Sequence, residues 1–310
     1  MPFLAVMLAF LMGYAVNQAS TCAVTASKLW VRSAQPDLMV GFGMAIGAAG
    51  MVTLPLAWWI GPAAHIQPLY ALSFRLVLGA VLLGLGAVIN DACLFGTLAR
   101  IGDGELRFLA LPLGLAVGFV FAEHLPGFDA PTRIANPLAT PGWGGVLVLL
   151  GCALLAGLCW RHLGQRTAPH SQTASWPLRR AMVLLGLAGA GLFTLTPGWT
   201  YADAVARWAR HHGTMQMVSV GAGLCALSVV LGALVSGRQR HSFCLVKPSM
   251  TAVLRSLVGG ATMALGASLV PGGNDSLLLA ALPVASLSGI VAYMTMTGAV
   301  IAMVKIMPFD

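Results

Sequence analysis

Long apolar stretches separated by short polar ones run along the whole chain. A segment of about 20 mostly apolar residues is long enough to cross the hydrocarbon core of a bilayer as a helix. On that basis the sequence predicts nine spans, near residues 2–19, 38–60, 71–90, 106–123, 142–161, 179–197, 214–236, 251–270 and 285–305. Shorter apolar pieces after Cys22, Cys93 and Asn274 are predicted to be half-helices or re-entrant segments. The pattern therefore indicates an all-α, polytopic membrane protein.

The composition supports this prediction and excludes a soluble fold. Only 8% of the 310 residues are charged and 58% are hydrophobic, whereas soluble domains carry about a quarter charged residues. The mean hydropathy of the chain is +0.86. The formal net charge of +8 comes from cations in short loops and not from a basic stripe interleaved with aromatic residues, so we expect no nucleic-acid partner. The lipid bilayer is the expected environment.

The positions of Lys and Arg predict the orientation of the spans. Basic residues gather in four loops, and placing all four in the cytoplasm gives a consistent alternation along the chain. Their members are Lys28 and Arg32; Arg100 and Arg107; Arg161, Arg166, Arg179 and Arg180; and Arg238, Arg240 and Lys247. The polar stretch 164–178 is predicted to be a cytoplasmic linker. It joins a first transmembrane half, residues 1–163, to a second, residues 179–310.

An internal repeat supports the two halves. FRLVLGAVLLGLGAVINDACLFG begins at Phe74 and resembles LRSLVGGATMALGASLVPGGNDS, which begins at Leu254. At one constant offset the pairs Arg75/Arg255, Gly79/Gly259, Gly86/Gly266 and Cys93/Gly273 align. The predicted topology runs the two segments in opposite directions, which is the inverted repeat of many transporters. We interpret Cys22 and Cys244 as similar places before the two repeat cores, with an insertion around residues 36–70. The alternative is that any two Gly-rich apolar helices look alike.

Four polar stretches interrupt the apolar pattern at or near the ends of the predicted helices. They are NQASTC from Asn17, NDACLFGT from Asn90, HSFCLVKPS from His241 and PGGNDS from Pro271. Polar residues at membrane depth are costly and tend to mark substrate paths. We predict that Asn90 and Asp91 cap one half-helix, and that Asn274 and Asp275 cap another after Gly272 and Gly273. The start of such a helix attracts anions, although each cap could equally end a loop at the membrane surface.

Six cysteines are present, and none belongs to a CxxC pair, so free thiols are expected. Cys93 is the strongest candidate for chemistry because it lies in a polar break beside a predicted helix start. Cys22 and Cys244 lie in comparable breaks, whereas Cys152, Cys159 and Cys225 are interpreted as packing residues. Taken alone, each cysteine is more often a small buried hydrophobe. The histidines lack metal-ligand spacing and no nucleophile elbow occurs, so we expect no metal, no cofactor and no enzyme.

The breaks resemble those of a known family. GLGAVINDACLFGTLARIGDGELRF from Gly84, STCAVTASKLWV from Ser20 and the second-half segment with SFCLVKPS are similar to the YeeE/YedE family of sulfur-compound transporters, which includes thiosulfate transporters. The resemblance implies thiosulfate uptake through an hourglass of inverted repeats, and transfer to a cytoplasmic sulfurtransferase. It also implies a central sulfur contact at Cys93, flanked by Cys22 and Cys244. This chain has Gly273 where many members have a cysteine.

These observations give one functional hypothesis and two alternatives. In the hypothesis, a sulfur oxyanion, most readily thiosulfate, passes Cys93 and leaves toward Lys28, Arg100 and Lys247 without redox chemistry. The candidate substrate-path residues are Cys93, Cys22, Cys244, Asn90, Asp91, Gly96, Gly272, Gly273, Asn274, Asp275 and Lys247. The first alternative is a membrane sulfur carrier or enzyme with a covalently modified Cys93. The second is a membrane subunit that transports nothing by itself.

Overall fold

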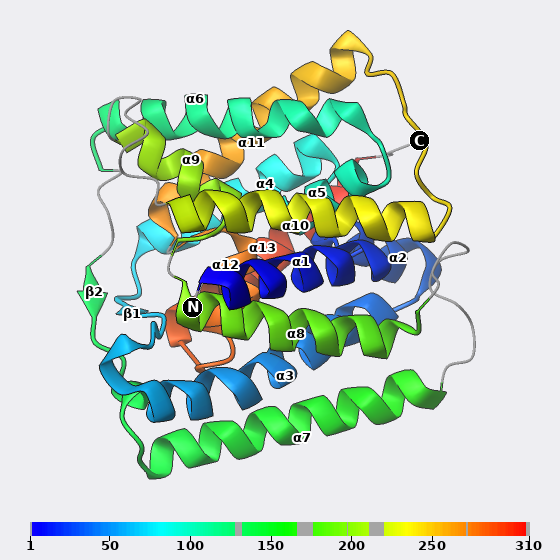
Figure 1. The fold of residues 1–310 in the computed structure, drawn as a ribbon. Coiled ribbons are helices and arrows are strands. Elements are labelled where there is room, and N and C mark those ends of the chain that lie inside the picture. Colours follow the sequence, from blue (N-terminus) through cyan, green and yellow to red (C-terminus); the bar gives the residue numbers. More distant parts are fainter. Residues whose placement is uncertain are drawn as a thin grey trace.

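The fold is a bundle of helices that lie roughly parallel or antiparallel to one another (Figure 1). The computed structural model describes residues 2–127, 132–165, 176–196, 198–210, 220–270 and 272–307. Its long helices are α1 (Pro2–Gln18), α3 (Asp37–Ile60), α4 (Phe74–Asn90), α6 (Leu111–His124), α7 (Trp143–Gln165), α8 (Leu178–Leu195), α10 (Val220–Gln239), α11 (Met250–Leu269) and α13 (Leu287–Ile306). Nine segments of the described chain are long and apolar enough to cross a membrane, which confirms the predicted number.

Shorter elements complete the fold. The short helices are α2 (Ala23–Ser33), α5 (Leu94–Gly102), α9 (Tyr201–Arg210) and α12 (Asn274–Ser276), which continues as the π-helical turn η5 (Leu277–Ala281). The 3-10 turns are η1 (Gly61–Ala63), η2 (Leu106–Ala110) and η3 (Pro137–Ala139). Strand β1 (Leu69–Tyr70) pairs antiparallel with β2 (Arg133–Ile134). The middle of the predicted 164–178 linker, residues 166–175, lies outside the described residues, as does the start of the predicted 214–236 span.

Each half-helix follows a long helix after a break in the chain. Helices α1 and α4 have 17 residues each and rise about 26 Å, less than the roughly 30 Å of a hydrocarbon core. The chain then breaks, and α2 or α5 continues from Cys22 or Cys93. The same pattern joins α8 to α9 and α11 to α12. Helix α9 was missed by the sequence prediction, which placed Arg207 in an outer loop.

Contacts between glycines and the backbone of the facing helix fix the relative directions of the helices. A Cβ on Gly79 would lie 2.6 Å from the Leu269 Cβ, and one on Gly86 would lie 2.6 Å from the Met263 backbone nitrogen. Positions that advance along α4 therefore meet positions that recede along α11, so these two helices are antiparallel. Small residues let the two backbones approach this closely. The predicted opposite directions of the two repeat cores are confirmed.

The contact between α1 and α10 is parallel by the same test. Ser228 donates to the Val6 carbonyl oxygen at 2.8 Å, and Ser236 donates to the Asn17 side-chain oxygen at 2.7 Å. From the first contact to the second, the residue number increases along both helices, so α1 and α10 are parallel. Because α1 and α10 come from different halves, the two halves are interleaved in the bundle rather than set side by side (Figure 1).

One detail of the predicted repeat is wrong. Helix α3 lies between α2 and α4 as α10 lies between α9 and α11, so the region predicted to be an insertion has a counterpart in the second half. Cys244 lies in an exposed loop between α10 and α11, whereas Cys22 begins a half-helix. The residue that begins a half-helix in the second half is Thr200, whose hydroxyl accepts a hydrogen bond from the Asp203 amide at 3.0 Å. Cys22 therefore corresponds in structure to Thr200 and not to Cys244.

The two ends of the bundle differ in charge and in structure. One end carries α2, α5 and the loop between α10 and α11, with Lys28, Arg100 and Arg240. The other end carries β1, β2 and α9 (Figure 1). Basic loops favour the cytoplasmic side, so we call the first the inner end and the second the outer end. Helix α7 lies at the periphery against α3 (Figure 1).

Candidate functional site

Two buried thiols lie where the half-helices α2 and α5 begin. Cys22 and Cys93 are the N-cap residues of these helices, and their side chains are 4% and 2% exposed. The Cys93 sulfur accepts hydrogen bonds from the Gly96 amide at 3.4 Å and from the Ala23 amide at 3.3 Å. The Cys22 sulfur lies against the same turn, since a Cβ on Gly96 would be 2.5 Å from it. We call these two residues the thiol pair; it couples the starts of α2 and α5.

The first-half residues predicted to cap a half-helix instead lie at the end of α4. Asn90 is the last residue of α4, and its amide donates to the Ala92 carbonyl oxygen at 2.8 Å and to the Thr97 hydroxyl at 3.1 Å. Asp91 ends α4 in the left-handed conformation, with a φ of 63°. The prediction that Asn90 and Asp91 cap α5 is therefore wrong. A cap must stand directly before the first helical turn, and Cys93 fills that position.

The second-half caps also differ from the prediction. Gly273 is the N-cap of α12, and Asn274 and Asp275 are its first helical residues. The Asn274 side-chain oxygen instead accepts a hydrogen bond from the Leu94 amide at 3.3 Å. This bond joins the start of α5 in one half to the start of α12 in the other. Asp275 bonds within its own turn, to the Ser276 amide at 2.9 Å.

Leu94 lies between these two starts. It is 1% exposed, and a Cβ on Gly273 would lie 2.3 Å from the Leu94 Cδ1 atom. The Tyr201 hydroxyl, at the start of α9, donates to the Leu94 carbonyl oxygen at 3.2 Å. On the other side, a Cβ on Gly96 would lie 2.5 Å from the Cys22 sulfur. The starts of α2, α5, α9 and α12 thus meet around Leu94 and the thiol pair.

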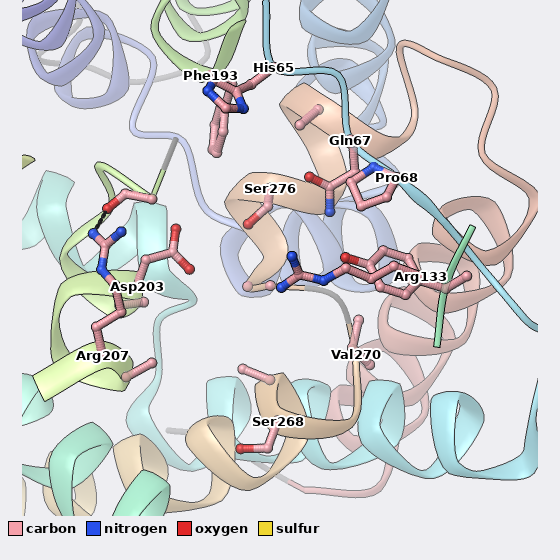
Figure 2. Close-up of a pocket in the computed structure, with 18 of the residues that line it drawn as sticks. His65, Gln67, Pro68, Arg133, Phe193, Asp203, Arg207, Ser268, Val270 and Ser276 are labelled. Carbon is pink, nitrogen blue, oxygen red and sulfur yellow. Dashed lines mark hydrogen bonds between the residues drawn. The ribbon is translucent and has the colours of Figure 1, made fainter. Parts of the chain in front are cut away.

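A cavity of about 440 Å³ opens from the outer end toward this meeting point (Figure 2). Its floor includes Gly272, Gly273 and Ser276. Its rim includes Tyr70 and Arg133, which face each other across the β1–β2 pair. Burial raises the pKa of Tyr70, and the positive charge of Arg133 opposes that shift. We call this cavity the outer vestibule; Leu94 separates its floor from Cys93.

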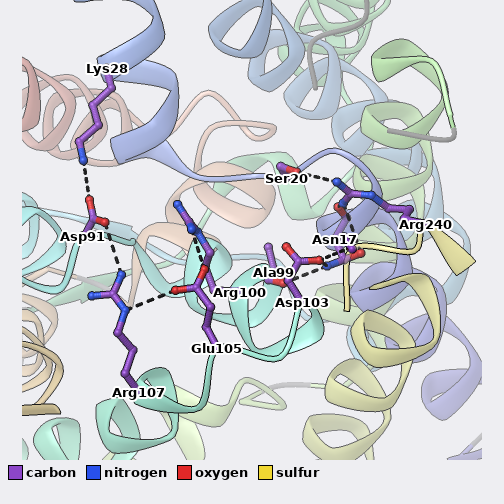
Figure 3. Close-up of polar contacts among 11 residues, drawn as sticks. Asn17, Ser20, Lys28, Asp91, Ala99, Arg100, Asp103, Glu105, Arg107 and Arg240 are labelled. Carbon is purple, nitrogen blue, oxygen red and sulfur yellow. Dashed lines mark hydrogen bonds and ion pairs between the residues drawn. The ribbon is translucent and has the colours of Figure 1, made fainter. Parts of the chain in front are cut away.

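An ion-pair network that includes Asp91, two residues before Cys93, lies at the inner end (Figure 3). The Lys28 Nζ atom lies 2.5 Å from Asp91 Oδ1, and Arg107 lies 3.4 Å from Asp91 Oδ2. Arg107 also lies 3.4 Å from Glu105, which pairs with Arg100 at 2.6 Å. We call these five residues the inner network; their three cations and two carboxylates leave one positive charge in excess. Asp91 therefore bridges α2 and the segment after α5.

A second polar cluster fixes the neighbouring helices at the inner end (Figure 3). Asn17 donates to the Ala99 carbonyl oxygen at 2.9 Å and to Asp103 at 3.0 Å. Arg240 donates to the Asn17 carbonyl oxygen, and Ser242 donates to Asp103 at 2.6 Å. Burial lowers the pKa of the Arg240 guanidinium, and Asp103 opposes that shift. This cluster ties α1 and α10 to the C-terminal end of α5, because Ala99 lies in its last turn and Asp103 is its C-cap.

The structure gathers some predicted site residues and separates others. Cys22, Cys93, Gly96, Gly273 and Asn274 meet at the centre, with Gly272 and Asp275 beside them. Lys247 lies at the inner end, beside a cavity of about 180 Å³ that Glu105 and Arg107 also line. Cys244 is exposed there, and its amide bonds to the Asp103 carbonyl oxygen at 2.9 Å. It is not part of the thiol pair.

Three residues of the site were missed by the sequence analysis. Nothing in the sequence marked Leu94 or Tyr201 as a site residue, except that each directly follows the residue that begins a half-helix. Arg133 lies in the two-residue strand β2, which no sequence pattern predicted. All six cysteines are free, as expected. Among the residues that the structure describes, no group of His, Cys, Asp and Glu is suited to hold a metal ion.

Comparisons with known proteins show the family of this chain. The model of a family described as sulphur transport matches residues 18–302. Over 165 aligned residues the chain is 27% identical to a probable transporter, YedE, of Salmonella typhimurium. That alignment covers 48% of this chain and 38% of the relative, so the chain matches less than half of the relative's length. Because the family match extends over both halves and the four half-helices, the chain belongs to the sulphur transport family.

Proposed function

We propose that this protein carries a small sulfur oxyanion, thiosulfate first among them, across a bacterial inner membrane into the cytoplasm. One observation carries the proposal. The two buried thiols of Cys22 and Cys93 lie at the starts of two half-helices, between an outer vestibule and an inner network of excess positive charge. A thiol is a soft group, and a helix start is an anion-binding group. Thiosulfate has a soft terminal sulfur and an oxyanion end, so it fits both.

A hydroxyl beside the thiol pair adds a donor for the oxyanion end. The Thr21 hydroxyl is fully buried and has no hydrogen-bond partner among the described residues. A buried hydroxyl without a partner costs free energy unless something else binds it. Thr21 directly precedes Cys22, so an anion whose sulfur contacts the thiol pair brings its oxygens near this hydroxyl. The binding is noncovalent and needs no redox step.

The proposed route has three parts. The anion enters the outer vestibule and reaches its floor at Gly273. It then displaces the Leu94 side chain and contacts the thiol pair. It leaves through the inner network once Asp91 releases Lys28 and Arg107, toward Lys247 and a cytoplasmic acceptor such as a sulfurtransferase. The exposed Cys244 lies near this exit and is the last thiol of the route.

The test uses three cysteine variants in proteoliposomes that contain only this protein. Cys93→Ser keeps an oxygen acceptor for the Ala23 and Gly96 amides but removes the soft sulfur. Cys93→Ala removes both. Cys225→Ala is the matched control, because Cys225 is buried in α10 and lies outside the thiol pair. Uptake of sulfur-labelled thiosulfate is measured beside the thermal stability of each variant.

Each outcome supports or contradicts a specific part of the proposed function. Normal uptake by Cys225→Ala with at least a tenfold loss in a stably folded Cys93→Ser supports a sulfur-contacting path. Full uptake by Cys93→Ser contradicts the role of the thiol and leaves a transporter with a structural cysteine. A stable mass adduct on Cys93 after exposure to thiosulfate favours a covalent sulfur carrier instead. No uptake by the folded wild type contradicts thiosulfate transport by this chain alone.

A further inference from the structure

The walls of the outer vestibule carry an uneven set of charges. Its charged side chains are Arg133, Arg207 and Asp203, apart from His65 at the rim. Asp203 and Arg207 are one helical turn apart on α9, where opposite charges offset each other. Arg207 also donates to the Gly198 carbonyl oxygen. Among the described residues that line it, the cavity therefore has one cation in excess, and that cation is Arg133.

The guanidinium of Arg133 points into the vestibule. Figure 2 shows it reaching from its strand toward Ser276 on the floor, with Asp203 and Arg207 on the opposite wall. Among the described residues the Arg133 side chain makes no hydrogen bond or ion pair, and it is exposed. Its five N–H groups remain open to a ligand, and an arginine fork matches the geometry of a carboxylate or an oxyanion.

The backbone beneath Arg133 is held in place by contacts on both sides. Tyr70 pairs with Arg133 in the β1–β2 ladder. Two residues after β2, the side-chain nitrogen of Asn136 donates to the Gln67 carbonyl oxygen at 3.0 Å. The side-chain oxygen of Asn136 accepts a hydrogen bond from the Leu138 amide at 3.0 Å. The His65 amide donates to the Thr194 carbonyl oxygen at 2.9 Å and so anchors the same segment to α8. These contacts fix the backbone of Arg133 at the rim, so its side chain starts from a defined place beside the vestibule.

A second observation also indicates an anion. The Arg207 Nε–H is buried and has no partner among the described residues. A buried charged donor without an acceptor is costly, and Arg207 lines the same cavity as Arg133. An oxyanion in the vestibule would provide acceptors for both guanidinium groups. Ser276 on the floor offers a hydroxyl to the same ligand.

We propose that the outer vestibule is a capture site for a small oxyanion, in which Arg133 is the principal binding residue. Its role is to concentrate the anion at the floor before the anion reaches the thiol pair. Oxygen geometry alone governs this site, so thiosulfate and sulfate bind it alike. Discrimination for sulfur follows deeper, at Cys22 and Cys93. The capture-site proposal depends on the proposed function only for the identity of the anion that is transported from the vestibule to the thiol pair.

The experiment separates capture from passage. Initial rates of thiosulfate uptake are measured against outside concentration for wild type, Arg133→Gln and Arg133→Lys. Arg75→Gln is the matched control, since Arg75 is an exposed cation at the same outer end and does not line the vestibule. A charge-assisted hydrogen bond is typically worth a factor of about 10 or more in affinity. We expect Arg133→Gln to raise KM about tenfold with the maximal rate kept within about twofold.

The two remaining variants test whether the effect is local. Arg133→Lys keeps the charge without the fork, so its KM should fall between wild type and Arg133→Gln. Arg75→Gln should change KM by less than about twofold at physiological salt, where charges are screened over about 8 Å. Equal effects of Arg75→Gln and Arg133→Gln would mean a general surface field and would overturn the capture site. So would a wild-type KM in Arg133→Gln.

A binding measurement keeps this test independent of transport. Calorimetric titration of the detergent-solubilised protein with sulfate and with thiosulfate should show both anions binding, each about tenfold more weakly in Arg133→Gln. If the wild type takes up no thiosulfate but this difference remains, the proposed function fails and the capture site stands. If Arg133→Gln binds both anions as tightly as the wild type, the capture site fails whatever the uptake result.

Discussion

Truncating Leu94 should open the way from the outer vestibule to Cys93. Leu94 is 1% exposed and Cys93 is 2% exposed, so a reagent in the vestibule reaches the thiol only when the Leu94 side chain moves. Moving it into a water-filled cavity exposes apolar surface. Leu94→Ala removes three carbons, each worth about 0.8 kcal/mol of burial. That lowers the cost of exposing Cys93 by about 2 kcal/mol, or roughly a 30-fold faster reaction.

The assay labels Cys93 from outside with a membrane-impermeant maleimide. Proteoliposomes of known orientation carry a Cys244→Ser background, because Cys244 is the exposed thiol of the described chain. Modified peptides are identified by mass spectrometry. Leu98→Ala is the matched control, since Leu98 is another buried leucine of α5, 5% exposed, one turn further along. Both truncations should lower thermal stability through loss of buried contacts, typically by 2–5 kcal/mol for such a change in a core.

The two variants differ in what they expose. Leu94→Ala should label Cys93 about 30-fold faster than the wild type, whereas Leu98→Ala should change the rate little. If the two variants label alike, the gain comes from general loosening of α5 and not from removal of a barrier. Unchanged labelling in Leu94→Ala would refute the reasoning, because the vestibule floor would then not lead to the thiol pair.

Two further predictions concern the inner network and the packing between the halves. Asp91→Asn removes both the Lys28 and the Arg107 pairs, which are partly exposed and so worth about 1 kcal/mol. Labelling of Cys22 from the inner side should therefore rise about fivefold, and no change would mean that the network does not restrict access. Gly86→Ala places a Cβ 2.6 Å from the Met263 backbone nitrogen and should lower thermal stability by about 1–3 kcal/mol. Gly298→Ala is its control, because a Cβ there meets open space, and equal stability of the two variants would contradict the close α4–α11 contact.

The spans could be predicted because each is determined by one continuous stretch of the sequence. An apolar run of about 20 residues has few alternatives in a membrane, so the nine predicted spans needed no tertiary information. The break before Cys93 was visible for the same reason, since Asn90 and Asp91 interrupt an apolar helix. The opposite directions of α4 and α11 followed from counting crossings between basic loops. These features depend on hydropathy and charge, which a sequence states directly.

The caps and the repeat partners depend on geometry that the sequence does not state. Asn and Asp are the usual caps, so Asn90 was preferred over Cys93. Helix α4 instead continues through Asn90, Asp91 takes up the left-handed turn, and α5 begins only at Leu94. Helix α9 was missed because its arginines suggested a loop. Thr200 was therefore not recognised as the structural counterpart of Cys22, and Cys244 was chosen because it has the same side chain.

The four half-helix starts explain why the vestibule opens on one side only. The inner half-helices α2 and α5 begin with Cys22 and Cys93, whereas the outer ones begin with Thr200 and Gly273. A glycine at position 273 leaves the space that the Leu94 side chain fills, and a Cβ there would lie 2.3 Å from it. The same absence of a side chain lets the cavity reach down to the floor. A cysteine at Gly273 would place a third thiol at the floor, but Leu94 would have to leave. A glycine at position 273 therefore fits the proposed route, in which the outer part would select by charge and only the thiol pair would select by sulfur.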